Sequence, residues 1–437
     1  MVDKKYLAIL KRGVEHWNKW KEKNLHLKID LKGINLSSKV SIGIDLTGVD
    51  LAGANLVKTN FCGANLDGAN LIGANLVKAN LTGASLSGAN LMGANLVKAN
   101  YRSAELVGAN LSLANLVFAD LRVVNFTSAQ LNNANFGGAN LDGAIFINTN
   151  LTRCNFKLAR LNQTNFSNAN LNQANLDGVS LVEANLTKAD LSGANLCNAN
   201  LSNAVLYKAN LEEANLSGAN LVKANLLKSD LTNAFLAEAN LVEAKLIRAN
   251  LYRADLNQAN LSKANLTNAK LVHTKACIAN FNRSILTGAC LESLQINHQT
   301  SFEKIVCQYL YLKDYQKQRR PTNPQLSISS GEFKSIIQDL RGSIYFVFDA
   351  EFDWSSFWHT FQKLQLRYRP QIIEIKAIEI LCNRRFMVKI NVIPGERIEA
   401  IENFFWHKYN LISLSQGNLS IKDSSNNHKQ HNCYEQN

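Results

Sequence analysis

The chain has 437 residues, of which 46% are hydrophobic and 19% are charged, and its formal net charge is +13. This length allows two or three domains. No apolar run of about 18 residues occurs, which argues against a membrane-spanning helix, and the first residues lack the apolar segment of a secretory signal. The eight cysteines form no C-x-x-C pair, so we expect a reducing, cytoplasmic location and neither a disulfide framework nor a metal site.

Residues 4–23 predict one amphipathic helix, because Tyr6, Leu10, Val14 and Trp17 recur at helical spacing. A helix at this place can cover the open end of the repetitive region that follows. We therefore expect residues 1–28 to be an N-terminal helical cap. Since the segment is basic and contains tryptophan, a peripheral membrane anchor is the alternative.

From Leu46 to Leu291 every fifth residue is Leu, Phe or Tyr, with Ala276 as the exception. A small residue, usually alanine, stands two positions before each of these central residues, and Asn or Asp commonly lies between them. A period of five fits neither a helix nor a strand. It predicts one short straight run and one turn per unit, with four sides closing a coil of about 20 residues that stacks on the next coil.

These units, such as Ala54-Asn55-Leu56 and Ala224-Asn225-Leu226, resemble the pentapeptide-repeat family, whose unit is A-(D/N)-L-x-x. The resemblance implies a right-handed quadrilateral β-helix over residues 29–299. The segment Gly13–Trp20 before the first coil is also similar to cyanobacterial members of that family.

Two departures from regularity are expected within the rod. Lys39 and Ser41 occupy positions that should be apolar, which predicts an irregular first coil or a bulge over residues 29–43. Glycine stands two positions after the centre in early units such as Gly63 and Gly83, where a type II turn requires a positive φ. Lys, Glu, Asn or Gln more often takes that position in the later half, so we predict fewer type II turns there.

Outward positions spaced by 20 residues form two basic rows on opposite faces. Such rows can be a docking stripe for an anionic partner, but a solvated face offset by Glu183, Glu213 and Glu243 is the interpretation we favour. Exposed aromatic residues, including Phe118, Tyr207 and Phe235, are further candidates for partner contacts. The possible interaction surface comprises Lys58, Lys78, Lys98, Phe118, Lys188, Lys208, Lys228 and Arg248.

After the rod, apolar residues from Phe302 to Leu312 predict a capping helix over residues 300–318, followed by a proline-containing linker over 319–331. Residues 332–416 predict a small α+β domain of ferredoxin-like βαββα order, closed by a fourth strand at Leu411–Leu414. The polar segment 417–437 is expected to be a disordered tail.

Chemistry-bearing residues gather only at Asp349, Glu351, Asp353 and His359, which could bind a divalent cation. We favour a helix cap for Asp353 and solvated loop charges for the others. No phosphate-binding loop or nucleophile motif is present. We therefore assign no catalytic, cofactor-binding or metal-binding residues and do not expect an enzyme.

The sequence thus favours a cytoplasmic protein-interaction scaffold with an unidentified protein partner and a second recognition element in the C-terminal domain. A branch of the resembled family inhibits DNA gyrase by imitating DNA, but imitation requires a continuous acidic surface, which this basic chain lacks. Binding to nucleic acid or an anionic membrane surface is a further alternative, suggested by the net charge.

Overall fold

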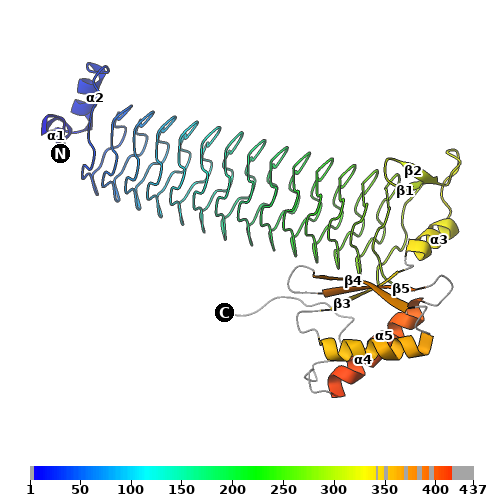
Figure 1. Cartoon of the computed structure of the whole chain (residues 1–437). Coiled ribbons are helices and arrows are strands. Elements are labelled where there is room, and N and C mark those ends of the chain that lie inside the picture. Colours follow the sequence, from blue (N-terminus) through cyan, green and yellow to red (C-terminus); the bar gives the residue numbers. More distant parts are fainter. Residues whose placement is uncertain are drawn as a thin grey trace. The chain divides into compact units, whose positions relative to one another are not determined.

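A computed structural model describes residues 4–340, 343–348, 353–368, 373–380, 386–392 and 398–415. The chain divides into two compact units. The first comprises residues 1–294 and 299–329, and it contains a long stack of coils (Figure 1). The second comprises residues 295–298 and 330–437. The expected tail over 417–437 lies outside the described residues.

The stack is built from parallel bridges between residues 20 positions apart, beginning with Asp30 and Asp50. The amide of Leu51 donates to the carbonyl of Asn70 at 2.7 Å, and the amide of Asn70 donates to Val49 at 3.0 Å. Each coil is therefore joined to the next by backbone hydrogen bonds on all four sides, as a period of five predicts. The asparagine side chains add a second ladder, in which Asn80 Nδ2 donates to Asn60 Oδ1 at 3.0 Å.

The interior of the stack is filled by the central residues and by the small residues two positions before them. Leu51 and Ala54 are both fully buried, and this pattern continues along the stack. In the middle coils phenylalanines form ladders, with the rings of Phe126 and Phe146 stacked at 4.9 Å and those of Phe146 and Phe166 at 4.8 Å. Repetition of one apolar layer thus produces a continuous core.

The turns are more uniform than the glycine pattern predicts. In the turn Leu51–Ala54 the amide of Ala54 donates to the carbonyl of Leu51 and Gly53 has φ +62°, which is type II geometry. Later turns keep a positive φ at the same position without glycine, as at Lys188 and Glu213. The prediction of fewer type II turns is therefore wrong, because hydrogen bonds to both neighbouring coils hold the backbone there.

The prediction of an irregular first coil is also wrong, since Val40 pairs with Asn60 in the ordinary register.

The N-terminal segment forms two helices, α1 Lys4–Leu10 and α2 Val14–Glu22, rather than one. Gly13 separates them with φ +100°, a conformation that ends a helix. Helix α2 covers the edge of the first coil. Asn18 Oδ1 accepts from the amide of Asp45 at 2.9 Å, and Lys21 Nζ donates to the carbonyl of Thr47 at 2.9 Å. Burial lowers the pKa of Lys21.

The expected capping helix over 300–318 is wrong, because the coil continues through it. Bridges join Asn280 to Ser301, Ile285 to Val306 and Cys290 to Tyr311. These pairs are 21 rather than 20 positions apart, so one additional residue lies between Leu294 and Ser301. The strands β1 Leu310–Lys313 and β2 Lys317–Arg320 then form an antiparallel hairpin, which also takes the first residues of the expected linker.

The second unit contains a three-stranded antiparallel sheet in the order β3-β5-β4. Helices α4 and α5 lie on one face of this sheet (Figure 1). Phe346 of β3 stacks on Phe405 of α5 at 3.9 Å within the buried core. The fourth strand expected at Leu411–Leu414 is wrong, because those residues belong to α5. The elements are α3 Ser330–Leu340, β3 Ser343–Phe348, α4 Trp354–Tyr368, β4 Ile373–Ile380, β5 Phe386–Val392 and α5 Ile398–Ser415.

Candidate functional site

The first basic row lies along one corner of the rod and ends at an aromatic ring. Its cations are exposed, and none has an ion pair with another described residue. Lys98 Nζ lies 5.9 Å from the ring centroid of Phe118, which is 61% exposed. That ring lies against Gly138 of the next coil, where an added Cβ would be 2.5 Å from a ring carbon. The first basic row comprises Lys58, Lys78 and Lys98.

The second basic row lies on the opposite face, and its four side chains are also exposed without an ion pair among the described residues. Two of the acids expected to offset this row contact other residues. Glu243 instead pairs with Lys223 and Lys263, and Glu183 accepts a hydrogen bond from Gln163 at 3.0 Å. These acids stand at the neighbouring corner of the coil, five residues away. The second basic row comprises Lys188, Lys208, Lys228 and Arg248.

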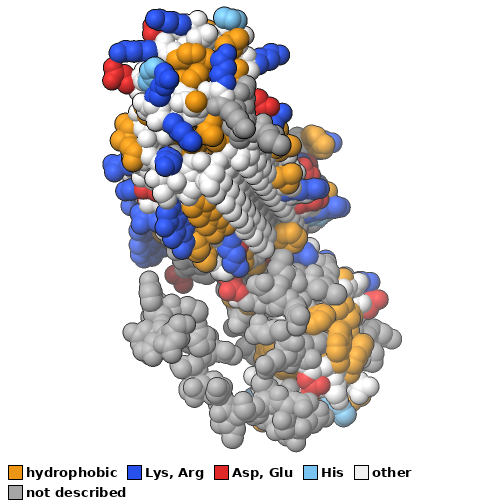
Figure 2. Space-filling model, turned by 90° about the vertical axis from the view of Figure 1, so that its left-hand side faces the viewer, with side chains coloured by type: hydrophobic (Ala, Val, Ile, Leu, Met, Phe, Trp, Pro, Cys, Tyr) orange, Lys and Arg blue, Asp and Glu red, His pale blue; other side chains and the backbone are white. Residues whose placement is uncertain are grey.

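Half-buried apolar side chains accompany both rows, because the residue before each cation is often apolar. Beside the second basic row, Lys208 Nζ lies 5.3 Å from the ring centroid of Tyr207. Figure 2 shows Lys and Arg side chains in rows along the rod with apolar side chains next to them. A surface that combines cations with apolar area suits an acidic, amphipathic partner. The apolar neighbours are Val57, Val77 and Val97 in one case and Tyr207, Leu227 and Ile247 in the other.

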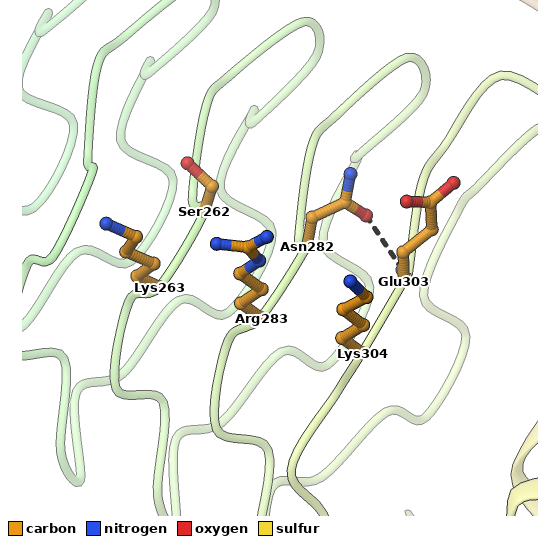
Figure 3. A pocket seen from close by; sticks show the side chains of 6 residues that line it. All are labelled: Ser262, Lys263, Asn282, Arg283, Glu303 and Lys304. Atoms are coloured by element: carbon orange, nitrogen blue, oxygen red, sulfur yellow. Dashed lines mark hydrogen bonds between the residues drawn. The ribbon is translucent and has the colours of Figure 1, made fainter.

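A third basic row was not found from the sequence. Lys263, Arg283 and Lys304 extend side by side from three successive coils (Figure 3). With Ser262, Asn282 and Glu303 they line a groove of about 320 Å³. The spacing of 20 residues finds Lys263 and Arg283, but the additional residue before Ser301 moves the third cation out of that register. A search that allowed one insertion would have found it.

The carboxylate group expected near the start of α4 is only partly described. Asp349 and Glu351 lie outside the described residues. Asp353 caps α4, since its Oδ1 accepts from the amide of Ser355 at 2.9 Å. His359 is exposed on the same helix. Within the described part of the chain, no group of three His, Cys, Asp or Glu side chains could hold a metal ion.

The repeated units of the rod match a known protein family. The sequence model of pentapeptide repeats (eight copies) matches segments that together cover residues 44–157 and 164–293, more than half of the chain. The chain belongs to the pentapeptide-repeat family. Members of this family fold as right-handed β-helices, so the stack of coils is the pentapeptide-repeat rod.

Solved structures of other pentapeptide-repeat proteins are similar to parts of this chain. HetL from the cyanobacterium Nostoc sp. strain PCC 7120, involved in heterocyst differentiation regulation, is 32% identical over 52% of this chain and 93% of its own, with a TM-score of 0.27. Rfr23 from the cyanobacterium Cyanothece 51142 is 33% identical over 30% and 83%, with a TM-score of 0.10. QnrB1, a plasmid-mediated fluoroquinolone resistance protein, is 16% identical over 48% and 92%, with a TM-score of 0.28.

Among curated proteins none matches the sequence. In the described part of this pentapeptide-repeat protein, no helix is long and apolar enough to cross a membrane.

Proposed function

We propose that this pentapeptide-repeat protein is a non-enzymatic interaction scaffold whose rod binds an acidic protein partner along a basic row. The observation that supports this proposal is the second basic row, in which four exposed cations stand on consecutive coils and form no ion pair with any residue that the structure describes. Neighbouring coils are about 4.8 Å apart, so the like charges that they carry repel each other. A partner that places carboxylates along this row would remove that repulsion while covering Tyr207 and Leu227.

The second unit has a separate role in this proposal. The second unit, with its split β3-α4-β4 arrangement around β5, would be a shortened ferredoxin-like module that supplies a second recognition element. We place the protein in the cytoplasm, in keeping with six described cysteines that form no disulfide.

Affinity purification from the native cell tests the scaffold. The wild-type chain is compared with a variant in which Lys188, Lys208, Lys228 and Arg248 are replaced by Gln. A matched control removes the same charge from dispersed, ion-paired cations, namely Lys32, Lys157, Arg160 and Lys223. We expect the partner with the wild type and the control but not with the row variant. Recovery of the protein alone, or equal recovery with the row variant, would contradict the proposal.

Nucleic acid is the alternative anionic partner, and the same purification distinguishes it. Nuclease treatment of the lysate should leave a protein partner bound and remove one held through nucleic acid. Retention on heparin that falls steeply with salt would favour nucleic acid, because phosphate contacts release counterions.

Modulation of DNA gyrase by imitation of DNA is not our proposal, because the outward rows of this rod carry lysine and arginine. Strong inhibition in a supercoiling assay with purified gyrase would contradict this choice.

A further inference from the structure

The groove beside Lys263, Arg283 and Lys304 differs from the two basic rows because it is concave and mixes cations with polar side chains (Figure 3). Its volume of about 320 Å³ is at the lower end of the range for small-molecule sites. All six lining residues belong to three consecutive coils, whose backbones are joined by hydrogen bonds. The backbone that carries the lining side chains is therefore fixed before any ligand arrives.

On the same corner of the rod, a glutamate carboxylate forms ion pairs with the lysines of both neighbouring coils. One coil earlier, Glu243 lies between two lysines, with Oε1 at 3.1 Å from Lys263 Nζ and Oε2 at 3.8 Å from Lys223 Nζ. The hydrogen bond with Lys263 is the main cause of a lowered pKa for Glu243. One carboxylate thus bridges cations that belong to the coils on either side of it.

Beyond Lys263 the pattern changes, because Arg283 and Lys304 follow each other without an acid between them in the row. Neither forms an ion pair with a described residue. The nearby amide of Asn282 is held in place, since its Oδ1 accepts from the amide of Glu303 at 2.7 Å and from Ser301 Oγ. The groove therefore presents two unneutralised cations in a fixed polar frame.

We propose that this groove binds the phosphate group of a small phosphate monoester between Arg283 and Lys304. The planar guanidinium of Arg283 can donate two parallel hydrogen bonds to phosphate oxygens, and Lys304 supplies a second positive charge. A dianion would bridge these side chains as Glu243 bridges its two lysines. The groove is larger than one phosphate group, so the esterified part lies beside Ser262.

Glu303 limits the affinity, because its carboxylate borders the same groove and repels a dianion. Its backbone amide, and not its carboxylate, holds Asn282. Replacement of Glu303 by Gln should therefore keep the frame while removing the repulsion, which gives a variant that binds more tightly.

Isothermal titration calorimetry of the full chain with inorganic phosphate, glucose 6-phosphate and glucose tests the proposal. We expect glucose 6-phosphate to bind more tightly than inorganic phosphate, and glucose to give no heat of binding. Arg283→Gln should weaken binding about tenfold, the effect of losing a charge-assisted pair. Glu303→Gln should strengthen it several-fold.

The matched control is Lys39→Gln, which removes one exposed cation from the first coil, at the other end of the rod from the groove. Its affinity should equal that of the wild type, and circular dichroism should show all variants folded. Absence of binding by the wild type, or equal weakening by Arg283→Gln and Lys39→Gln, would overturn the proposal. Equal affinities for the two phosphates would assign the site to the free ion. Because the scaffold proposal rests on a different row, either can fail alone.

Discussion

The indole Nε1 of Trp17 donates a hydrogen bond of 2.6 Å to the backbone carbonyl of Asp45. In later coils the corresponding carbonyl accepts a hydrogen bond from a backbone amide of the preceding coil. The carbonyl of Asn65, for example, accepts from the amide of Leu46. The first coil has no such predecessor, so a side chain of α2 replaces the missing backbone donor. Trp17 is fully buried and also contributes apolar area to this cap.

Replacement of Trp17 by Ala should therefore lower the free energy of unfolding of the rod by about 3–5 kcal/mol. Trp17→Phe keeps most of the ring but leaves the carbonyl without its donor, so it should cost about 1–3 kcal/mol. Urea denaturation followed by circular dichroism measures both. The control is Lys19→Ala on the exposed side of α2, which should leave the stability nearly unchanged. Equal stability of Trp17→Ala and Lys19→Ala would contradict the capping role.

A second prediction concerns Tyr101, the tyrosine among the central residues. It is 1% exposed, and its hydroxyl has no hydrogen-bond partner among the described residues. Burial raises the pKa of this phenol. Tyr101→Phe should therefore be neutral or stabilise the rod by up to about 2 kcal/mol, since it removes an unsatisfied buried group. A clear loss of stability in thermal unfolding would show that the hydroxyl has a partner.

The phenylalanine ladder gives a third prediction. The ring of Phe146 lies between those of Phe126 and Phe166, whereas Phe61 is buried without an aromatic contact among the described residues. Each stacked pair contributes about 0.5–1.5 kcal/mol beyond its buried area. Phe146→Leu should thus destabilise the rod by about 1–3 kcal/mol more than Phe61→Leu. Equal losses for the two variants in urea denaturation would mean that stacking adds nothing.

The uniform turns lead to a fourth prediction at Glu213, which has φ +57° and is exposed. A side chain in this conformation is strained by about 1 kcal/mol relative to glycine. Glu213→Gly should therefore be about 1 kcal/mol more stable than Glu213→Ala, which lacks the charge but keeps the strain. The reverse order of melting temperatures would show that chain entropy outweighs the strain.

A fifth prediction uses the thiols. Burial raises the pKa of Cys154 to about 12, whereas Cys62 is partly exposed. At pH 8 only about one part in ten thousand of such a thiol is ionised, and the thiolate is the reactive form. Iodoacetamide should therefore label Cys62 and leave Cys154 unmodified until urea unfolds the rod, as peptide mapping by mass spectrometry would show. Labelling of both at similar native rates would contradict the burial.

The sequence predicts the rod well because a period of five specifies both the buried residues and the turns. It fails where two patterns use the same residues. Phe302 and Leu310 fit a helix, yet they also continue the repeat after one additional residue, and backbone pairing with Asn280 decides between these structures. Leu411 fits a short closing strand in isolation, but it lies within α5, where its side chain is 49% exposed.

The candidate surface shows the same division. A spacing of 20 residues is sufficient to place the cations of the second basic row, such as Lys208, on one corner. Which acids touch them depends on the neighbouring corner, so the sequence assigned Glu243 to the wrong row. The groove at Arg283 required the register of the last coils, which the spacing alone does not give.

Because each coil binds only the coils before and after it, the length of this rod is adjustable in fixed steps. Removing 20 consecutive residues from the middle should bring the two ends about 4.8 Å closer while every remaining side chain keeps its corner. Removing 21 or 19 would leave one turn with a residue too few or too many, and the later rows would keep their corners only where the backbone absorbs that change locally, as it does before Ser301. The number of coils thus sets the length of the rod. The insertion after Leu294 changes the spacing of paired residues from 20 to 21 in the sequence, and it leaves the paired residues on the same corner.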